Sequence, residues 1–62
     1  MENIAQIGVI YSYTNKYNYT TTIKVSRITD KSIFYYALLD SKAWSNIEFR
    51  ISHNSFKYYK SI

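Results

Sequence analysis

The sequence predicts an all-β fold, in which residues 1–62 form one small domain: a five-stranded barrel with a short helical turn before the last strand. Apolar and polar residues alternate along several short segments, which is the pattern of strands that bury one face. The composition is 47% hydrophobic and 19% aromatic, without cysteine. A chain this short therefore needs a dense hydrophobic core, or a second copy in a homodimer to complete that core.

The first two strands are expected to form a hairpin. Residues 4–13 are β-formers, and the only glycine, Gly8, indicates a bulge within them. After a polar break at residues 14–16, residues 17–26 alternate between an apolar face and a hydroxyl-rich face. The short polar link between the two segments favours a hairpin, although it lacks the Asn-Gly pair that would define the turn type.

The middle of the chain predicts a turn and a buried strand. Residues 29–32 form the turn, in which the Asp30 side chain can hydrogen-bond the local backbone. Residues 33–39 are apolar on both faces, as in a central strand that is covered on both sides. A short buried helix would show the same pattern, but the flanking turn residues and the aromatic content favour the strand.

The last third of the chain predicts a loop, a strand, a helical turn and a short final strand. The loop over residues 42–46 carries Trp44, and residues 47–51 then alternate as the fourth strand. Ser52 is expected to cap one or two helical turns within residues 53–59, and the end of the chain adds the last strand.

The main core side chains are expected on the most apolar run and on the elements that close over it. These are Phe34, Tyr36, Leu38, Phe49 and Phe56. Each is large and apolar enough to remove a substantial area from water, which a domain of this size needs.

The order of these elements resembles that of the small SH3-like barrels found in many short proteins of phages and mobile elements. Gly8-Val9-Ile10-Tyr11 is similar to the Gly-x-Ile-Tyr strand that often opens them, and Ser52 with Phe56 is similar to their Ser-x-x-x-Phe turn before the last strand. The resemblance implies an SH3-like barrel of phage or mobile-element origin. Such barrels bind proteins or nucleic acids, so the fold does not choose the partner.

The side-chain inventory argues against catalysis. His53 is the only imidazole, and the chain has no Gly-rich phosphate loop, paired-carboxylate motif or metal-ligand spacing. We therefore expect no enzyme activity, no cofactor and no metal site, with His53 at the surface. No apolar run approaches the roughly 18 to 20 residues of a membrane span, and the beginning of the chain lacks a signal peptide, so a cytoplasmic protein without membrane contact is expected.

Basic and aromatic residues interleave along the chain, and this feature predicts binding. Eight Lys and Arg stand against four Asp and Glu, a net charge of +4. Bases stack on exposed rings while Lys and Arg hold phosphates, so nucleic acid is the first predicted partner. The candidate binding residues are Lys24, Arg27, Trp44, Arg50, Lys57, Tyr58 and Lys60.

A protein partner is the alternative. Tyr, Trp and Arg dominate the energetics of protein interfaces, and eight Tyr, three Phe and one Trp exceed what a minimal core can bury. The protein would then inhibit or modulate a host enzyme or a defence complex. A third interpretation needs no partner, because in so aromatic a chain some rings stay exposed whatever the function.

Overall fold

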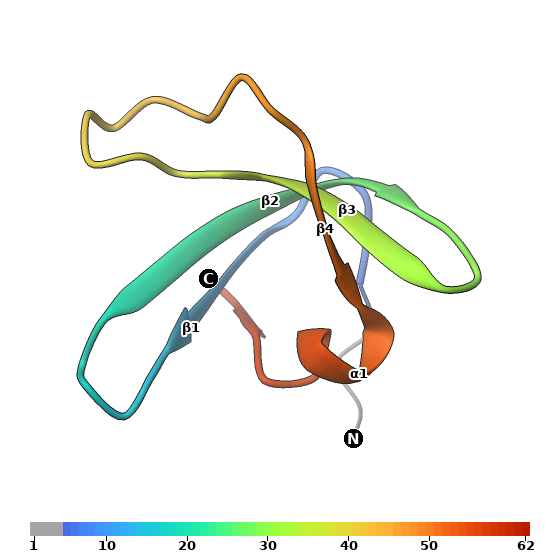
Figure 1. Cartoon of the computed structure of the whole chain (residues 1–62), viewed down its shortest axis with the longest axis horizontal. Coiled ribbons are helices and arrows are strands. Elements are labelled where there is room, and N and C mark those ends of the chain that lie inside the picture. Colours follow the sequence, from blue (N-terminus) through green and yellow to red (C-terminus); the bar gives the residue numbers. More distant parts are fainter. Residues whose placement is uncertain (1–4) are drawn as a thin grey trace.

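The computed structural model describes residues 5–62, which form five strands in one antiparallel sheet and one short helix (Figure 1). The elements are β1 (Ile10–Thr14), β2 (Thr20–Ile28), β3 (Ser32–Ala37), β4 (Phe49–Ser52), α1 (His53–Phe56) and β5 (Lys60–Ser61). Strands dominate this part of the chain, and the helical turn directly precedes the last strand, so the prediction of a mostly β fold is confirmed.

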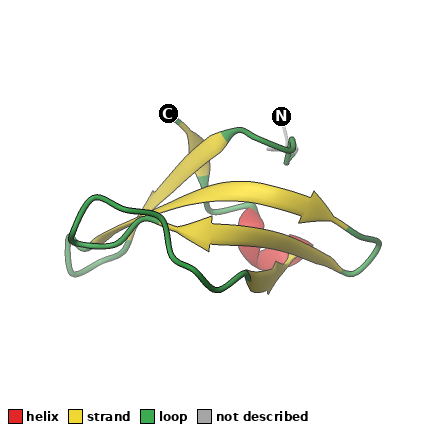
Figure 2. Ribbon diagram, turned by 90° about the horizontal axis from the view of Figure 1, so that it is seen from above, coloured by secondary structure: helices red, strands yellow, loops and turns green. Residues whose placement is uncertain are grey.

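The sheet has the strand order β4-β3-β2-β1-β5, so β4 and β5 are its two edges. Within residues 5–62 no strand pairing joins these edges, and the sheet is therefore open rather than closed into a barrel. The strands cross at angles instead of lying in a flat layer (Figure 2), which is the twist that L-amino acids impose. Residues 53–59 lead the chain from one edge to the other.

The β1–β2 hairpin closes through a loop that lies later in the chain than predicted. Thr14 remains in β1 opposite Thr20, and their hydroxyl oxygens are 2.8 Å apart. The side-chain oxygen of Asn15 accepts hydrogen bonds from the backbone N–H groups of Tyr17 and Tyr19, at 2.8 and 3.0 Å. Because this side chain replaces backbone partners in the turn, the hairpin forms without an Asn-Gly pair.

Gly8 marks a bulge, as predicted, but before β1 and not inside a strand. Its backbone N–H donates to the Val25 carbonyl at 2.8 Å, while the Val25 N–H donates to the Val9 carbonyl at 3.2 Å. Gly8 and Val9 therefore both lie opposite the single residue Val25, which defines a bulge. Gly8 has a φ of 86°, a conformation that side chains disfavour. β1 begins at Ile10, after this bulge, and the predicted strand start at residue 4 lies outside the described residues.

The β2–β3 turn differs from the prediction, whereas the cap of α1 agrees with it. In the β2–β3 turn, Thr29 and not Asp30 supplies the side-chain contact, since its Oγ1 accepts the N–H of Ser32 at 3.0 Å. α1 is a single turn that Ser52 caps, as predicted, by accepting the N–H of Ser55 at 3.1 Å. The turn residues thus act through short local hydrogen bonds that the sequence signals only by residue type.

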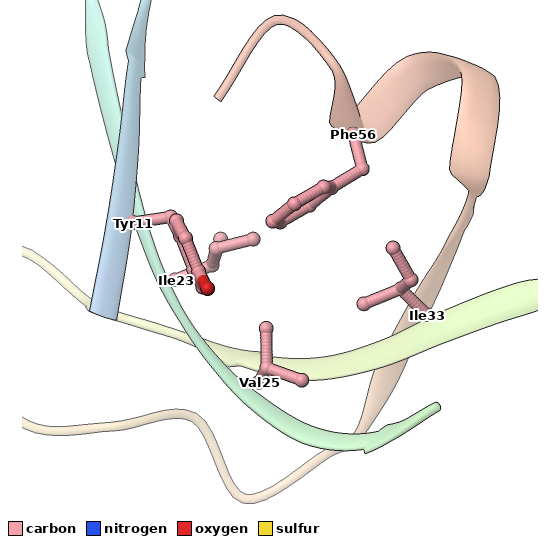
Figure 3. Close-up of a cluster of buried hydrophobic side chains, with 5 residues drawn as sticks. All are labelled: Tyr11, Ile23, Val25, Ile33 and Phe56. Atoms are coloured by element: carbon pink, nitrogen blue, oxygen red, sulfur yellow. The ribbon is translucent and has the colours of Figure 1, made fainter. Parts of the chain in front are cut away.

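The core lies on one face of the sheet, called here the inner face, and α1 closes it (Figure 3). Its buried side chains come from three strands and α1 and point toward one another; they are Tyr11, Ile23, Val25, Ile33 and Phe56. The rings of Tyr11 and Phe56 meet edge to face, with centroids 4.8 Å apart. This geometry is favourable for aromatic pairs and places Phe56 at the centre of the cluster.

Of the five predicted core side chains only Phe56 is buried. The other four are partly buried or exposed: Phe34, Tyr36, Leu38 and Phe49. For Phe34, Tyr36 and Leu38 the reason is strand parity, because residues 33–39 are apolar at nearly every position and the pattern does not tell which alternate set faces inward. Phe49 lies on the inward side, opposite Tyr35, but it stands on the edge strand β4 and stays largely exposed. On β3 the inward set is Ile33 and Tyr35, and their neighbours therefore face away from the core.

We predict that Phe56→Ala lowers the free energy of unfolding by about 3 to 5 kcal/mol, because it empties the centre of a small core. Phe49→Ala removes a ring of the same size that is 43% exposed, and should cost only about 1 to 2 kcal/mol. Urea unfolding followed by far-UV circular dichroism measures both losses. Equal losses in the two variants would show that the core has been assigned to the wrong side chains.

Candidate functional site

The face of the sheet opposite the core, called here the outer face, carries cations and aromatic rings in cross-strand rows. Lys24 on β2 lies opposite Tyr36 on β3. In the next row, Phe34 on β3 lies between Arg27 on β2 and Arg50 on β4. Directly paired residues place their Cβ atoms roughly 4.5 to 5.5 Å apart, so these side chains form one continuous surface.

An irregularity in β2 turns Arg27 to this face. Side chains alternate along a strand, and Ile23 and Val25 face inward, so a regular strand would direct Arg27 inward as well. The register between β2 and β3 shifts between Val25 and Arg27. The shift accommodates Ser26 as an extra residue and sets Arg27 opposite the outward-facing Phe34.

Glu48 and the ring of Phe34 hold the Arg27 side chain in place. Arg27 Nη2 lies 2.8 Å from Glu48 Oε1, and Ser26 Oγ donates a hydrogen bond to the other oxygen of the same carboxylate. The guanidinium carbon lies 4.1 Å from the Phe34 ring centroid, a cation–π contact. The hydrogen bonds from Arg27 and Ser26 lower the pKa of Glu48, and the carboxylate in turn raises the pKa of Arg27.

Two depressions follow the two rows of the outer face. The first, called here the arginine groove, has a volume of about 530 Å³ and is lined by Arg27 and Arg50 together with the β2–β3 turn. The second, called here the Trp44 pocket, has a volume of about 390 Å³, and its lining includes Lys24, Tyr36 and Trp44. The lining of the arginine groove thus has three cations and one carboxylate, that of Asp30, whereas the lining of the Trp44 pocket has two aromatic residues and one cation. Adjacent strand positions connect the two depressions.

Hydrogen bonds to the end of β3 fix the loop between β3 and β4, which carries Trp44 and is called here the Trp44 loop. Leu38 forms a β-bridge to Trp44, and the Ser45 N–H donates to the Ala37 carbonyl at 2.8 Å. Ser45 Oγ accepts the Ala37 N–H at 3.1 Å and donates to the Ile47 carbonyl at 2.8 Å. These bonds tie the loop to the end of β3, so the Trp44 pocket has a wall that is anchored in the sheet.

The structure brings four of the seven predicted binding residues together. They are Lys24, Arg27, Trp44 and Arg50, which line the two depressions. The other three lie elsewhere: Lys57 and Tyr58 follow α1, with Lys57 Nζ 5.4 Å from the Tyr58 ring centroid, and Lys60 lies on the edge strand β5. The predicted set is therefore two groups, and the first lines the two depressions.

Phe34, Tyr36 and Glu48 belong to the outer face but were not among the predicted binding residues. The prediction places the two rings in the core because they lie in the apolar run. Glu48 was not predicted because a glutamate in a sequence indicates only an exposed position. The missed signal is geometric: when a strand is apolar on both faces, one alternate set of side chains has to leave the core. That set supplies the rings between the predicted cations.

Groups suited to other chemistry are sparse in the structure. The Nε2 atom of His53 lies 2.7 Å from the Thr29 carbonyl oxygen, and the residue is exposed, as predicted. Among residues 5–62, no three His, Asp or Glu side chains gather as metal ligands would. No helix in this described part of the chain is long and apolar enough to span a membrane.

Comparisons of the chain with models of protein families, with curated proteins and with solved structures give no match. The outer face is therefore the basis on which a function can be assigned. Glu48 pairs with Arg27, whereas Lys24 and Arg50 form no ion pair within residues 5–62. Two of the three cations on this face are thus available to an external anion.

We predict that Glu48 makes folding stability depend on pH at the acid end. Its pKa is lower in the folded chain than its ordinary value of 4.5, so the contribution is complete above about pH 4.5 and is lost as the pH falls through the folded-state pKa. Urea unfolding at pH 7 and pH 3 should show a smaller acid loss for Glu48→Gln than for the wild type. Asp40→Asn, on the exposed β3–β4 loop, is the matched control, and an unchanged acid loss in Glu48→Gln would contradict the assignment.

Proposed function

We propose that the protein binds nucleic acid through the outer face and that it is not an enzyme. The observation that carries the proposal is the row in which Phe34 lies between Arg27 and Arg50, beside the row of Lys24 and Tyr36. Cations on neighbouring strands can each neutralise a phosphate, and rings between them can contact bases. Sheet faces that combine these two properties are suited to nucleic acids, and especially to single strands.

Sequence selectivity should be weak. α1 is one turn long, too short to act as a recognition helix in a major groove. The affinity would come mainly from phosphate contacts of Lys24, Arg27 and Arg50, which position a backbone but carry no sequence information. Aromatic contacts would add to that affinity with little preference among bases.

We also propose that the fold is of the SH3-like class and of phage or mobile-element origin. Support comes from the bulge at Gly8 that opens β1 and from the turn from Ser52 to Phe56 directly before β5. β5 pairs with β1, so the end of the chain returns to its first strand, as a barrel-like arrangement requires. Many functions share such folds, so the fold does not decide the partner.

We predict that the protein binds DNA or RNA oligonucleotides at about 50 mM salt, with a slope of log affinity against log salt of about −2 to −3 for three phosphate contacts. Lys24→Glu and Arg50→Glu should each weaken binding and flatten the slope. Lys57→Glu makes the same charge change away from the two depressions and should have a much smaller effect. Fluorescence anisotropy of labelled oligonucleotides measures all four proteins, and no binding to any single- or double-stranded form would reject the proposal.

We predict further that Glu48→Gln tightens nucleic-acid binding several-fold. The carboxylate competes with phosphate for Arg27, and its removal leaves the guanidinium free for the ligand. Asp40→Asn changes the net charge equally without a contact to Arg27, so the same anisotropy titration separates the two causes. Equal gains in both variants would show that overall charge, and not release of Arg27, sets the affinity.

A protein partner is the second candidate, and a different surface favours it. Tyr17 and Tyr19 in the β1–β2 loop are 78% and 64% exposed, and exposed tyrosines often anchor protein interfaces. The protein would then inhibit or modulate a host enzyme or a defence complex. A pull-down from host lysate with and without nuclease separates the candidates. A protein that is retained after nuclease treatment and lost with Tyr17→Ala would favour the second.

A further inference from the structure

We propose that the Trp44 pocket binds one unpaired base of a single-stranded nucleic acid, with Lys24 at the neighbouring phosphate. This inference rests on the proposed function. It adds the place at which a base is bound and a structural reason for a single-stranded ligand, neither of which follows from the cations alone.

The walls of the Trp44 pocket fit a flat heterocycle. Trp44 and Tyr36 supply aromatic rings and the exposed Ile7 an aliphatic surface, and every base can stack on such rings. The volume of about 390 Å³ is at the lower end of the roughly 300 to 1,000 Å³ of small-molecule pockets. The pocket therefore has room for one base and little more.

The polar groups in the lining can meet the edge of a base. Ser26 Oγ donates its proton to Glu48, and Ser45 Oγ donates its proton to the Ile47 carbonyl. A hydroxyl has one proton and two lone pairs. Ser45 Oγ also accepts the Ala37 N–H and keeps one lone pair for a ligand, and Ser26 Oγ can accept as well. They can accept an N–H group of a base, whereas a hydrocarbon ligand would leave them unused.

The charges beside the pocket favour a polyanion as its occupant. Lys24 lines the pocket, and the arginine groove follows at the next cross-strand row. Tyr36 and Phe34 lie on the same side of β3, two residues apart, so the ring that lines the Trp44 pocket is next to the row that holds Arg27. A nucleic-acid strand with one base in the pocket can thus place its phosphates next to Lys24, Arg27 and Arg50.

Access to the pocket distinguishes single strands from duplexes. The pocket is a depression between the outer face and the Trp44 loop, and a base reaches its rings only after leaving a stack. In a duplex this requires loss of pairing and stacking, whereas a single strand presents bases without that cost. The phosphates of a duplex can still contact the arginine groove, so the expected difference lies in affinity and in contact with Trp44.

The pocket is formed before the ligand arrives. The hydrogen bonds of Ser45 and the bridge from Leu38 fix the Trp44 loop to β3. On the opposite side Gly8 lines the pocket, and no atom lies within 4 Å of the place where a β-carbon would stand, so this rim is open. A preorganised site loses less conformational entropy when it binds.

The test uses Trp44 as its own reporter, because the chain has one tryptophan. The protein is titrated with a single-stranded oligonucleotide of about 12 nucleotides, as DNA and as RNA, and with a duplex of the same sequence. We expect the single strand to quench Trp44 fluorescence and to protect it from acrylamide, and the duplex to do neither. Trp44→Ala should weaken single-strand binding about 10- to 100-fold, and Trp44→Phe should restore part of it.

The outcomes separate this inference from the function on which it rests. Tyr17→Ala removes an exposed ring outside the pocket and should bind as the wild type does. If neither strand form binds, the proposed function fails. If single strand and duplex bind equally and Trp44 fluorescence does not respond, nucleic acid binds but the pocket is not a base site. Should Trp44→Ala fail to fold, Trp44→Phe and the wild-type fluorescence decide between these results.

Discussion

The packing of Phe56 against the inner face is the contact on which the rest of the structure depends. α1 has four residues, too few to be stable alone, so its place comes from this buried ring and from the Ser52 cap. Phe56 shares one cluster with Tyr11 on β1 and Ile33 on β3, two strands that do not pair with each other. The ring thereby holds the curved sheet together across β2. The chain supplies one edge strand, β4, directly before α1 and the other, β5, shortly after it.

The same strands carry the core and the candidate site, so the inner packing positions the outer rows. On β3, Ile33 and Tyr35 face the core while Phe34 and Tyr36 face outward. The outer face therefore needs no core of its own. A chain of 62 residues has apolar material for one core, and strands used on both sides allow a second surface to be ordered without more chain.

Local sequence patterns predicted the strands and the helical turn, whereas the pairing of strands decided which side chains face the core and which face outward. The alternation around Ile23 identified β2 and its buried side, and Ser52 identified the helical turn, because both depend on near neighbours. Lys24 could be placed on the outer face by the same alternation. Arg27 could not, because the register shift that turns it outward involves β3 and no Gly or Pro signals it. The Trp44 pocket likewise depends on a loop whose path local residue types do not determine.

The two-sided use of β3 has a consequence for how such a chain can change over time. Insertion or deletion of one residue within Ser32–Ala37 would exchange the two alternate sets, so that Phe34 would turn toward the core and Ile33 toward solvent. Core and binding surface would be lost in the same event. The length of this strand is therefore constrained more strictly than the identity of any one of its residues, whereas the β1–β2 loop can vary in length without this effect.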